Sequence, residues 1–215
     1  MKEFSISQKR ITAFAGLLGS AIFVLTFTIE GFIRPGYDPL STFVSALSLG
    51  PRGWIQITNF LIFGILLFLF TRCIADEFRS GKASKGGLVL LTIIAVCYFF
   101  SGPFVMDPTG TPLAQATVHG TVHGILGGIV FMLMPISCFV YLRRFWLDPK
   151  WKSMKWWTLV LGVISAIGTV MLTLTTKSPH LAVFFSPWFG LIQRTVIVPF
   201  MIWIFVFALK FLRTK

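Results

Sequence analysis

The sequence predicts an all-α integral membrane protein that folds as a six-transmembrane-helix bundle. Hydrophobic residues make up 55% of the 215 residues and charged residues only 12%, compared with about 25% in soluble domains. Six apolar runs are each long enough to cross the hydrocarbon core, which takes about 20 helical residues. Because no connecting loop is long enough to form a separate domain, we expect one membrane domain over residues 1–215.

The expected spans follow from these apolar runs and the signals at their ends. The first run is too long for a signal peptide and lacks a small-residue cleavage site, so we interpret it as a retained span. Trp54 suits the membrane interface at the start of the second span, and Thr111-Pro112 predicts the start of the fourth. The spans are expected at about residues 11–33, 54–73, 86–106, 112–141, 156–176 and 188–212.

A short interfacial helix is predicted over residues 39–48, between the first two spans. Asp38 followed by Pro39 is typical of an N-cap and the first helical residue. Gly50-Pro51 then marks the end of the helix. Apolar residues recur at helical spacing between these signals, at Leu40, Phe43, Val44 and Leu47.

Positive charge is distributed unevenly between the two sides of the predicted bundle. Most Lys and Arg residues fall in stretches 1–10, 72–85, 143–155 and 210–215, which all lie on one side. The other side carries only Arg34, Arg52, Lys177 and Arg194. The positive-inside rule therefore predicts that both termini are cytoplasmic. The net charge of +12 is explained by this topology, and it does not call for a nucleic-acid partner.

Two histidines lie four residues apart in the stretch after Asp107. His119 and His123 share one face of the predicted fourth span, and two imidazoles at this spacing can bind one zinc ion. His180 is a candidate third ligand on the same outer side, and Asp107 is a candidate to orient a ligand or act as general base. The alternative is that both histidines are hydrogen-bonded core residues and that Asp107 forms a turn or cap.

A row of small residues accompanies the histidines. Gly120, Gly124 and Gly128 recur every four residues, and such rows let a neighbouring helix approach closely. We therefore expect this face of the fourth span to point into the bundle.

Arg194 is an ionisable side chain inside a predicted span, where an unpaired charge is expensive. Glu30 is its expected ion-pair partner, with Asp107 and Asp38 as alternatives. In a second interpretation, Arg194 with its neighbour Gln193 and these acids forms a site for a lipid phosphate or a substrate carboxylate.

Ser41 and Ser45 lie at i and i+4 of the predicted short helix, so they share a face. Capping and helix packing are the simpler explanation of these serines. The alternative is that Ser41 assists a metal-bound water in catalysis.

Several chemistries lack support. The sequence contains no GxxxxGK[ST], GxGxxG or GxSxG motif, so nucleotide sites and a serine-hydrolase elbow are not indicated. Two histidines on one helix face cannot sandwich a haem. The spacing of Cys73, Cys97 and Cys138 suggests neither a disulfide framework nor a metal site, and we expect small buried side chains.

Four segments resemble, in order, the signature segments of a prokaryotic membrane-protein family catalogued as domain of unknown function 998. They are YDPLSTFVSALSLGPRGWIQITNFLIFG, GPFVMDPTG, VHGTVHGILGG and GLIQRTVIVPFMIWIFVF. The resemblance implies a six-span bundle and implies no biochemical activity. Members often carry a Glu-Arg pair at the start of the last span, where this chain has Gln193-Arg194, so a role for that acid does not carry over.

The residue types also resemble, more loosely, the alkaline ceramidase and adiponectin-receptor-like membrane hydrolases. That resemblance implies a zinc ion held by three histidines, with a nearby Asp and Ser. The matching types are His119, His123, His180, Asp107, and Ser41 or Ser45. The chain departs from that superfamily in span number and motif order.

Three functions are compatible with these features. The first is a plasma-membrane protein with an outer polar pocket that binds a membrane lipid or small amphiphile. The second is a zinc-dependent hydrolase of a lipid-like substrate, and the third is a small transporter.

Overall fold

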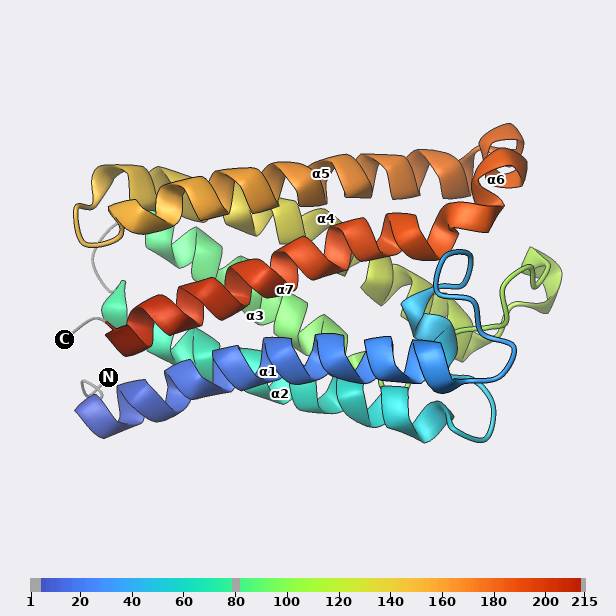
Figure 1. Ribbon diagram of the computed structural model, residues 1–215, viewed down its shortest axis with the longest axis horizontal. Helices are drawn as coiled ribbons and strands as arrows, with labels where there is room; N and C mark the ends of the chain where they lie inside the picture. The colour runs from blue at the N-terminus through green and yellow to red at the C-terminus, as the bar shows by residue number, and fades with distance from the viewer. Residues whose placement is uncertain (1–4, 79–81, 214–215) are drawn as a thin grey trace.

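The computed structural model of the chain describes residues 5–78 and 82–213. Within these ranges it contains α-helices and short 3₁₀ turns and no strand, which confirms the all-α prediction (Figure 1). Residues 1–4, 79–81 and 214–215 lie outside the described residues. They include Lys2, Arg79 and Lys215 of the charge count.

Long helices run the length of the bundle and short elements lie in the connections. The long helices are α1 (Ile6–Ile33), α2 (Gly53–Glu77), α3 (Lys82–Phe100), α4 (Val118–Leu147), α5 (Lys155–Lys177) and α7 (Phe189–Arg213). The short elements are η1 (Val44–Ser48), η2 (Leu113–Gln115), η3 (Lys152–Met154), α6 (Pro179–Phe185) and η4 (Ser186–Trp188). Figure 1 shows both chain ends at the same end of the bundle, which we call the termini end. The short elements η1, η2 and α6 lie at the opposite end, which we call the α6 end.

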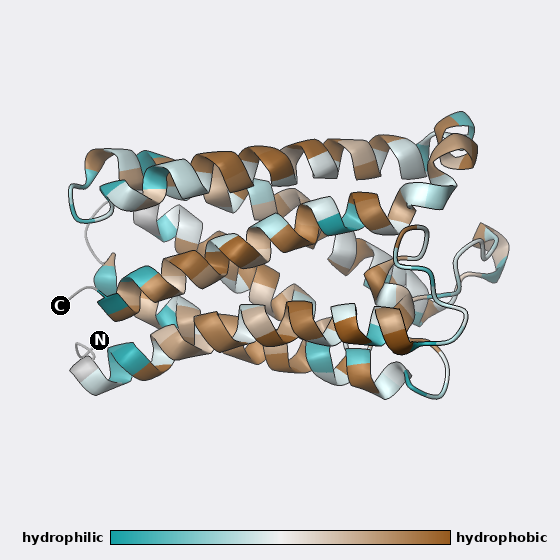
Figure 2. Cartoon of the chain, in the orientation of Figure 1, coloured by the Kyte–Doolittle hydropathy of each residue, from teal (hydrophilic) through white to brown (hydrophobic). Residues whose placement is uncertain are grey.

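Five stretches of the described chain are long and apolar enough to cross a membrane, as expected for a multi-pass membrane protein. They are Ser7–Ile33, Gly53–Glu77, Val118–Leu147, Lys152–Lys177 and Pro179–Arg213. The apolar part of α3, Lys85–Phe100, is shorter. Figure 2 shows hydrophobic residues along the middle of the helices and hydrophilic residues gathered towards the termini end and the loops.

The helices form a closed ring of neighbours. Each long helix contacts the next along the chain from α1 to α5, and α7 contacts both α5 and α1. The largest buried side chains are mostly aromatic, and many gather at the termini end. Tyr141, Phe145, Trp151 and Phe207 pack there with ring centroids 5.1–5.7 Å apart in the contacting pairs. The aromatic contacts fill the core at this end.

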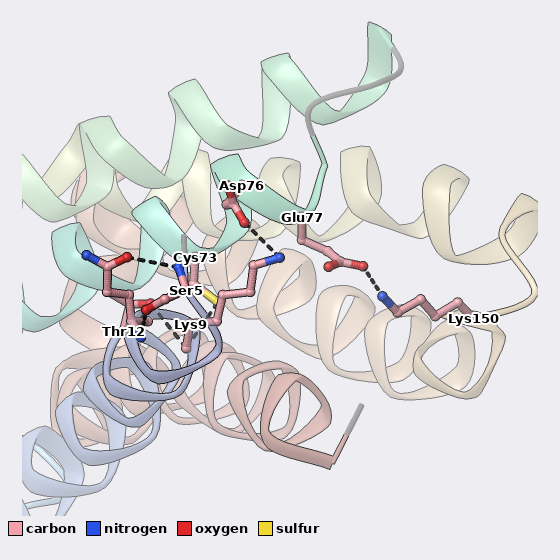
Figure 3. A network of polar contacts seen from close by, with 8 residues as sticks. Ser5, Lys9, Thr12, Cys73, Asp76, Glu77 and Lys150 are labelled. Carbon is pink, nitrogen blue, oxygen red and sulfur yellow. Dashed lines mark hydrogen bonds and ion pairs between the residues drawn. The ribbon is translucent and has the colours of Figure 1, made fainter. Parts of the chain in front are cut away.

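Polar contacts join the helices at the termini end (Figure 3). Lys9 of α1 forms an ion pair with the buried Asp76 of α2 at 2.8 Å, and the Cys73 thiol donates to the Lys9 carbonyl at 3.6 Å. Glu77 pairs with Lys150, which precedes α5. These contacts tie α1 to α2, and α2 to the connection between α4 and α5.

Two predicted helix boundaries were wrong. α3 ends at Phe100 and not near residue 106, because Gly102 and Pro103 interrupt the helix. α4 begins at Val118 and not at residue 112, because the Thr117 side chain is its N-cap and accepts from Gly120 N. Residues 101–117 are therefore almost entirely non-helical.

The helix predicted over residues 39–48 is shorter than expected, and the link predicted before the last span contains a helix. Only Val44–Ser48 is regular, and it is a 3₁₀ turn. Side chains of α7, described below, bind the backbone of this segment in place of regular helical hydrogen bonds. α6 was not predicted, although Pro179 occupies its first turn, a position that favours helix initiation.

We expect Gly64→Ala to destabilise the protein by about 1–3 kcal/mol. A Cβ at Gly64 would lie 2.6 Å from Phe99 N and 2.8 Å from Ala95 O, so the backbones of α2 and α3 would have to separate. Thermal unfolding in detergent measures the effect. The control is Gly86→Ala, where a Cβ would have no atom within 4 Å and alanine favours the helix. Equal stability of the two variants would contradict the close packing of α2 on α3.

Candidate functional site: a cleft between α4 and α5

A cleft of about 590 Å³ opens between α4 and α5 towards the α6 end. Its volume lies within the roughly 300–1,000 Å³ of small-molecule sites. One wall is a glycine-rich face of α4, and the opposite wall carries three threonines of α5. Its lining comprises Phe43, Ser45, Met106, Asp107, Gly120, His123, Gly124, Gly127, Gly128, Phe131, Met132, Thr169, Leu172, Thr173, Thr176, Lys177 and Gln193.

The glycines of α4 make room for the cleft. A Cβ at Gly124 or Gly128 would meet no atom within 4 Å, and one at Gly127 would meet only the Phe131 ring at 3.9 Å. The prediction that this row brings a neighbouring helix close was therefore wrong for Gly124 and Gly128. Both glycines are exposed, so the cleft is open sideways as well as towards the α6 end.

Asp107 caps the start of α4. Its Oδ2 accepts from Thr117 N at 2.9 Å and its Oδ1 accepts from Thr117 Oγ1 at 2.8 Å. A Cβ at Gly120 would overlap the carboxylate, so glycine is required for this approach. The negative charge is favourable at a helix N-terminus. Asp107 was expected to form a turn or cap at the end of the third span, but its contacts support the start of α4 instead, and the side chain also lines the cleft.

The two histidines of α4 bind the backbone that follows α3. His119 Nδ1 donates to the Pro103 carbonyl at 3.2 Å, and His123 Nδ1 donates to the Phe104 carbonyl at 2.7 Å. These donors satisfy carbonyls that lie beyond the end of α3. With the proton on Nδ1, the Nε2 of a neutral imidazole is an acceptor. His123 is buried and lines the cleft, whereas His119 is exposed and does not.

His180 does not join the other histidines in a metal site. It lies exposed on α6. Within residues 5–78 and 82–213, no three His, Cys, Asp or Glu side chains are grouped so that they can hold a metal ion. The described residues therefore offer His119 and His123 without the third ligand that the zinc prediction requires.

Glu30 does not pair with Arg194. It accepts from Arg52 Nε at 3.2 Å and from Arg52 Nη2, and its Oε2 lies 3.6 Å from Arg34 Nη2. Glu30 lies in the last turn of α1, beside the start of α2, where Arg52 is the N-cap position. The pairing predicted between α1 and α7 is therefore replaced by one between α1 and the connection that leads into α2.

Arg194 instead binds the backbone of the segment between α1 and η1. Its Nη1 donates to the carbonyls of Pro39 at 2.6 Å and Thr42 at 3.3 Å, and its Nη2 donates to the Tyr37 hydroxyl at 2.8 Å. A third Nη1 contact reaches the Gly190 carbonyl at 2.9 Å. The guanidinium thus holds the irregular segment against α7 and does not line the cleft.

Gln193 and Ser45 extend this support into the cleft. Gln193 Oε1 accepts from Val44 N at 2.6 Å, which fixes η1 to α7. Both Gln193 and Ser45 line the cleft. Ser41 and Ser45 do not share a helix face as predicted, because the regular part of the segment begins only at Val44.

Asp38 and Ser41 form a local turn outside the cleft. Asp38 Oδ1 accepts from Leu40 N at 3.0 Å and Oδ2 accepts from Ser41 Oγ at 2.7 Å. These two hydrogen bonds favour the carboxylate and lower the pKa of Asp38. Tyr37, beside it, has a raised pKa because burial disfavours the phenolate, although Arg194 opposes this shift.

The sequence interpretation missed the threonine wall and Lys177. Thr169, Thr173 and Thr176 line the cleft from one face of α5, and Lys177 follows at its end. Their spacing at i, i+4 and i+7 is a signal that the sequence contains. It was overlooked because threonine is common in membrane helices and carries no charge.

We expect Ser41→Ala to raise the pKa of Asp38 towards its ordinary value, because one of the two main hydrogen bonds to the carboxylate is lost. The folded-state pKa lies below the unfolded one. The turn's stabilisation is therefore complete above the unfolded pKa and lost as pH falls through the folded pKa. Carboxyl NMR titration of labelled protein measures the pKa. Ser45→Ala is the control, and equal pKa values in the two variants would contradict the Asp38–Ser41 contact.

Of the two resemblances described above, the comparisons with known proteins support the one to domain of unknown function 998. No curated protein matches the chain, and no solved structure does. A family model matches residues 17–210, which covers the cleft, η1 and all the long helices except the first residues of α1 and the last of α7. The chain therefore belongs to the family described as protein of unknown function (DUF998).

Proposed function

We propose that this protein binds a membrane lipid or other small amphiphile in the α4–α5 cleft. The observation that carries the proposal is the cleft itself, which glycines of α4 keep open. Gly124, Gly128, Met132 and Leu172 offer an apolar path along the helices. Asp107, Thr176 and Lys177 place polar groups at the α6 end. This is the division that an amphiphile with an apolar chain and a polar head group requires.

The sideways opening gives such a ligand a route from the bilayer. Met132 of α4 lines the cleft and is exposed, and other exposed apolar side chains lie on the same two helices: Ile125 and Ile129 on α4, and Val170, Met171 and Leu174 on α5. In a membrane these surfaces face lipid tails, so an acyl chain enters the cleft without crossing water.

The proposal includes the six-span topology and a plasma-membrane location. We count α3 as a span in addition to the five longer apolar stretches, which makes six. The termini end is cytoplasmic by the positive-inside rule. The cleft then faces the outer leaflet. A connection that leaves helical geometry at this depth is tolerated because protein side chains satisfy its backbone.

We expect the double substitution Gly124→Leu/Gly128→Leu to reduce bound lipid at least about tenfold, since the new side chains occupy the cleft. Native mass spectrometry of protein purified in mild detergent measures the bound lipid. Gly86→Leu is the matched control. Gly86 is also an exposed helical glycine with open space around it, but it lies on α3 and does not line the cleft. Undiminished lipid in the double variant, with normal thermal stability, would disprove binding in the cleft.

The second candidate is a zinc-dependent hydrolase of a lipid-like substrate. One observation favours it: both histidines direct Nδ1 to a backbone carbonyl, the arrangement that orients Nε2 towards a metal in known sites. The ligand count opposes it, since a catalytic zinc has three protein ligands. The transporter alternative has less support, because buried aromatic side chains fill the termini end.

We expect elemental analysis of protein purified without chelators to find substoichiometric zinc. Two histidines without a third ligand bind the metal only weakly. The His119→Ala/His123→Ala variant, measured beside the wild type, should give the same result. About one zinc per chain that disappears in this variant would instead make the hydrolase the leading function.

A further inference from the structure

A small recess adjoins the cleft. This cavity of about 20 Å³ is lined by residues that include Ser45, His123, Gly127, Phe131 and Gln193, all of which also line the cleft. The recess and the cleft therefore share part of their walls. The volume of the recess is close to the roughly 10–15 Å³ that one water molecule needs, so it admits a group of the size of a hydroxyl.

One side chain of the recess has a hydroxyl without a partner. Tyr98 of α3 lines the recess, is 4% exposed, and its hydroxyl forms no hydrogen bond to any described residue. A buried donor without a partner costs about 1–3 kcal/mol. A bound group that hydrogen-bonds to this hydroxyl would relieve the penalty.

Other polar residues of the recess retain hydrogen-bonding capacity. The Ser101 hydroxyl donates to the Cys97 carbonyl at 2.8 Å, which leaves its oxygen as an acceptor. His123 donates through Nδ1, which leaves Nε2 as an acceptor, and Gln193 accepts through Oε1, which leaves its amide NH₂ as a donor. The residues that line the recess therefore include both unused donors and unused acceptors.

The recess contains no formally charged side chain among the described residues. Its other walls are apolar and include Phe23, Phe60 and Ile197. A charged head group would lose its hydration here without gaining a counter-charge, which is strongly unfavourable. The recess therefore suits a neutral group that both donates and accepts.

We propose that the ligand is an uncharged, hydroxyl-bearing amphiphile whose hydroxyl enters the recess and hydrogen-bonds to Tyr98, while its apolar part lies in the cleft along Gly124 and Gly128. This inference rests on the proposed binding function and defines its ligand class; it places the ligand's hydroxyl in the recess and not beside Asp107, Thr176 and Lys177. It also assigns Tyr98 as a specificity residue.

The test compares hexadecanol with hexadecyl methyl ether, which keeps the chain but lacks the donor and has a larger polar end. Displacement of radiolabelled hexadecanol from detergent-purified wild-type protein by each unlabelled compound gives both affinities. We expect hexadecanol to bind about tenfold more tightly than the ether. Tyr98→Phe should abolish this preference and leave the affinity for the ether unchanged.

Tyr141→Phe is the matched control. The Tyr141 hydroxyl is also buried and without a partner among the described residues, but Tyr141 lines neither the recess nor the cleft. This variant should keep the full preference for hexadecanol. Thermal unfolding of both variants checks that they fold, which we expect because neither hydroxyl forms an internal hydrogen bond.

The outcomes separate this inference from the proposed function. If both amphiphiles bind equally and Gly124→Leu/Gly128→Leu blocks both, the cleft binds amphiphiles but the recess holds only water, and the hydroxyl inference is wrong. Retention of the preference in Tyr98→Phe also overturns it. If neither amphiphile nor any co-purified lipid binds the wild type, the proposed function itself fails.

Discussion

The constraint on which this structure depends is that backbone polar groups need partners where the helices stop inside an apolar bundle. Two connections at the α6 end leave helical geometry, residues 34–52 and 101–117. Side chains of the neighbouring helices supply the missing partners. Arg194 and Gln193 of α7 bind the first connection, and His119 and His123 of α4 bind the second. Polar residues that look catalytic in the sequence thus support the fold.

The cleft follows from the same arrangement. Asp107 and Thr117 fix the start of α4, where Gly120 packs against the Asp107 carboxylate, and one and two turns later Gly124 and Gly128 face open space. The hydroxyls of the facing threonines donate to backbone carbonyls of α5 itself: Thr173 Oγ1 donates to Thr169 O at 2.8 Å, and Thr176 Oγ1 donates to Leu172 O at 2.6 Å. The wall of α5 is therefore polar without carrying an unsatisfied donor.

The two ends of the bundle are built differently. Ion pairs such as Lys9–Asp76 and a packed aromatic core close the termini end. The α6 end instead has irregular connections and the cleft with its recess. The cleft is therefore open at one end and to the side, and the packed core separates it from the termini end. This asymmetry favours a binding protein over a conduit.

The helical class, the approximate positions of the long helices and the family could be predicted from the amino-acid sequence, because these depend on apolar runs and local motifs. The partners of the polar side chains could not be predicted and became visible only in the folded chain. Glu30 pairs with Arg52 and not Arg194, and Gly124 faces open space and not a helix. Partner choice depends on how helices distant in sequence are rotated and where each one ends, and no local pattern encodes those two properties.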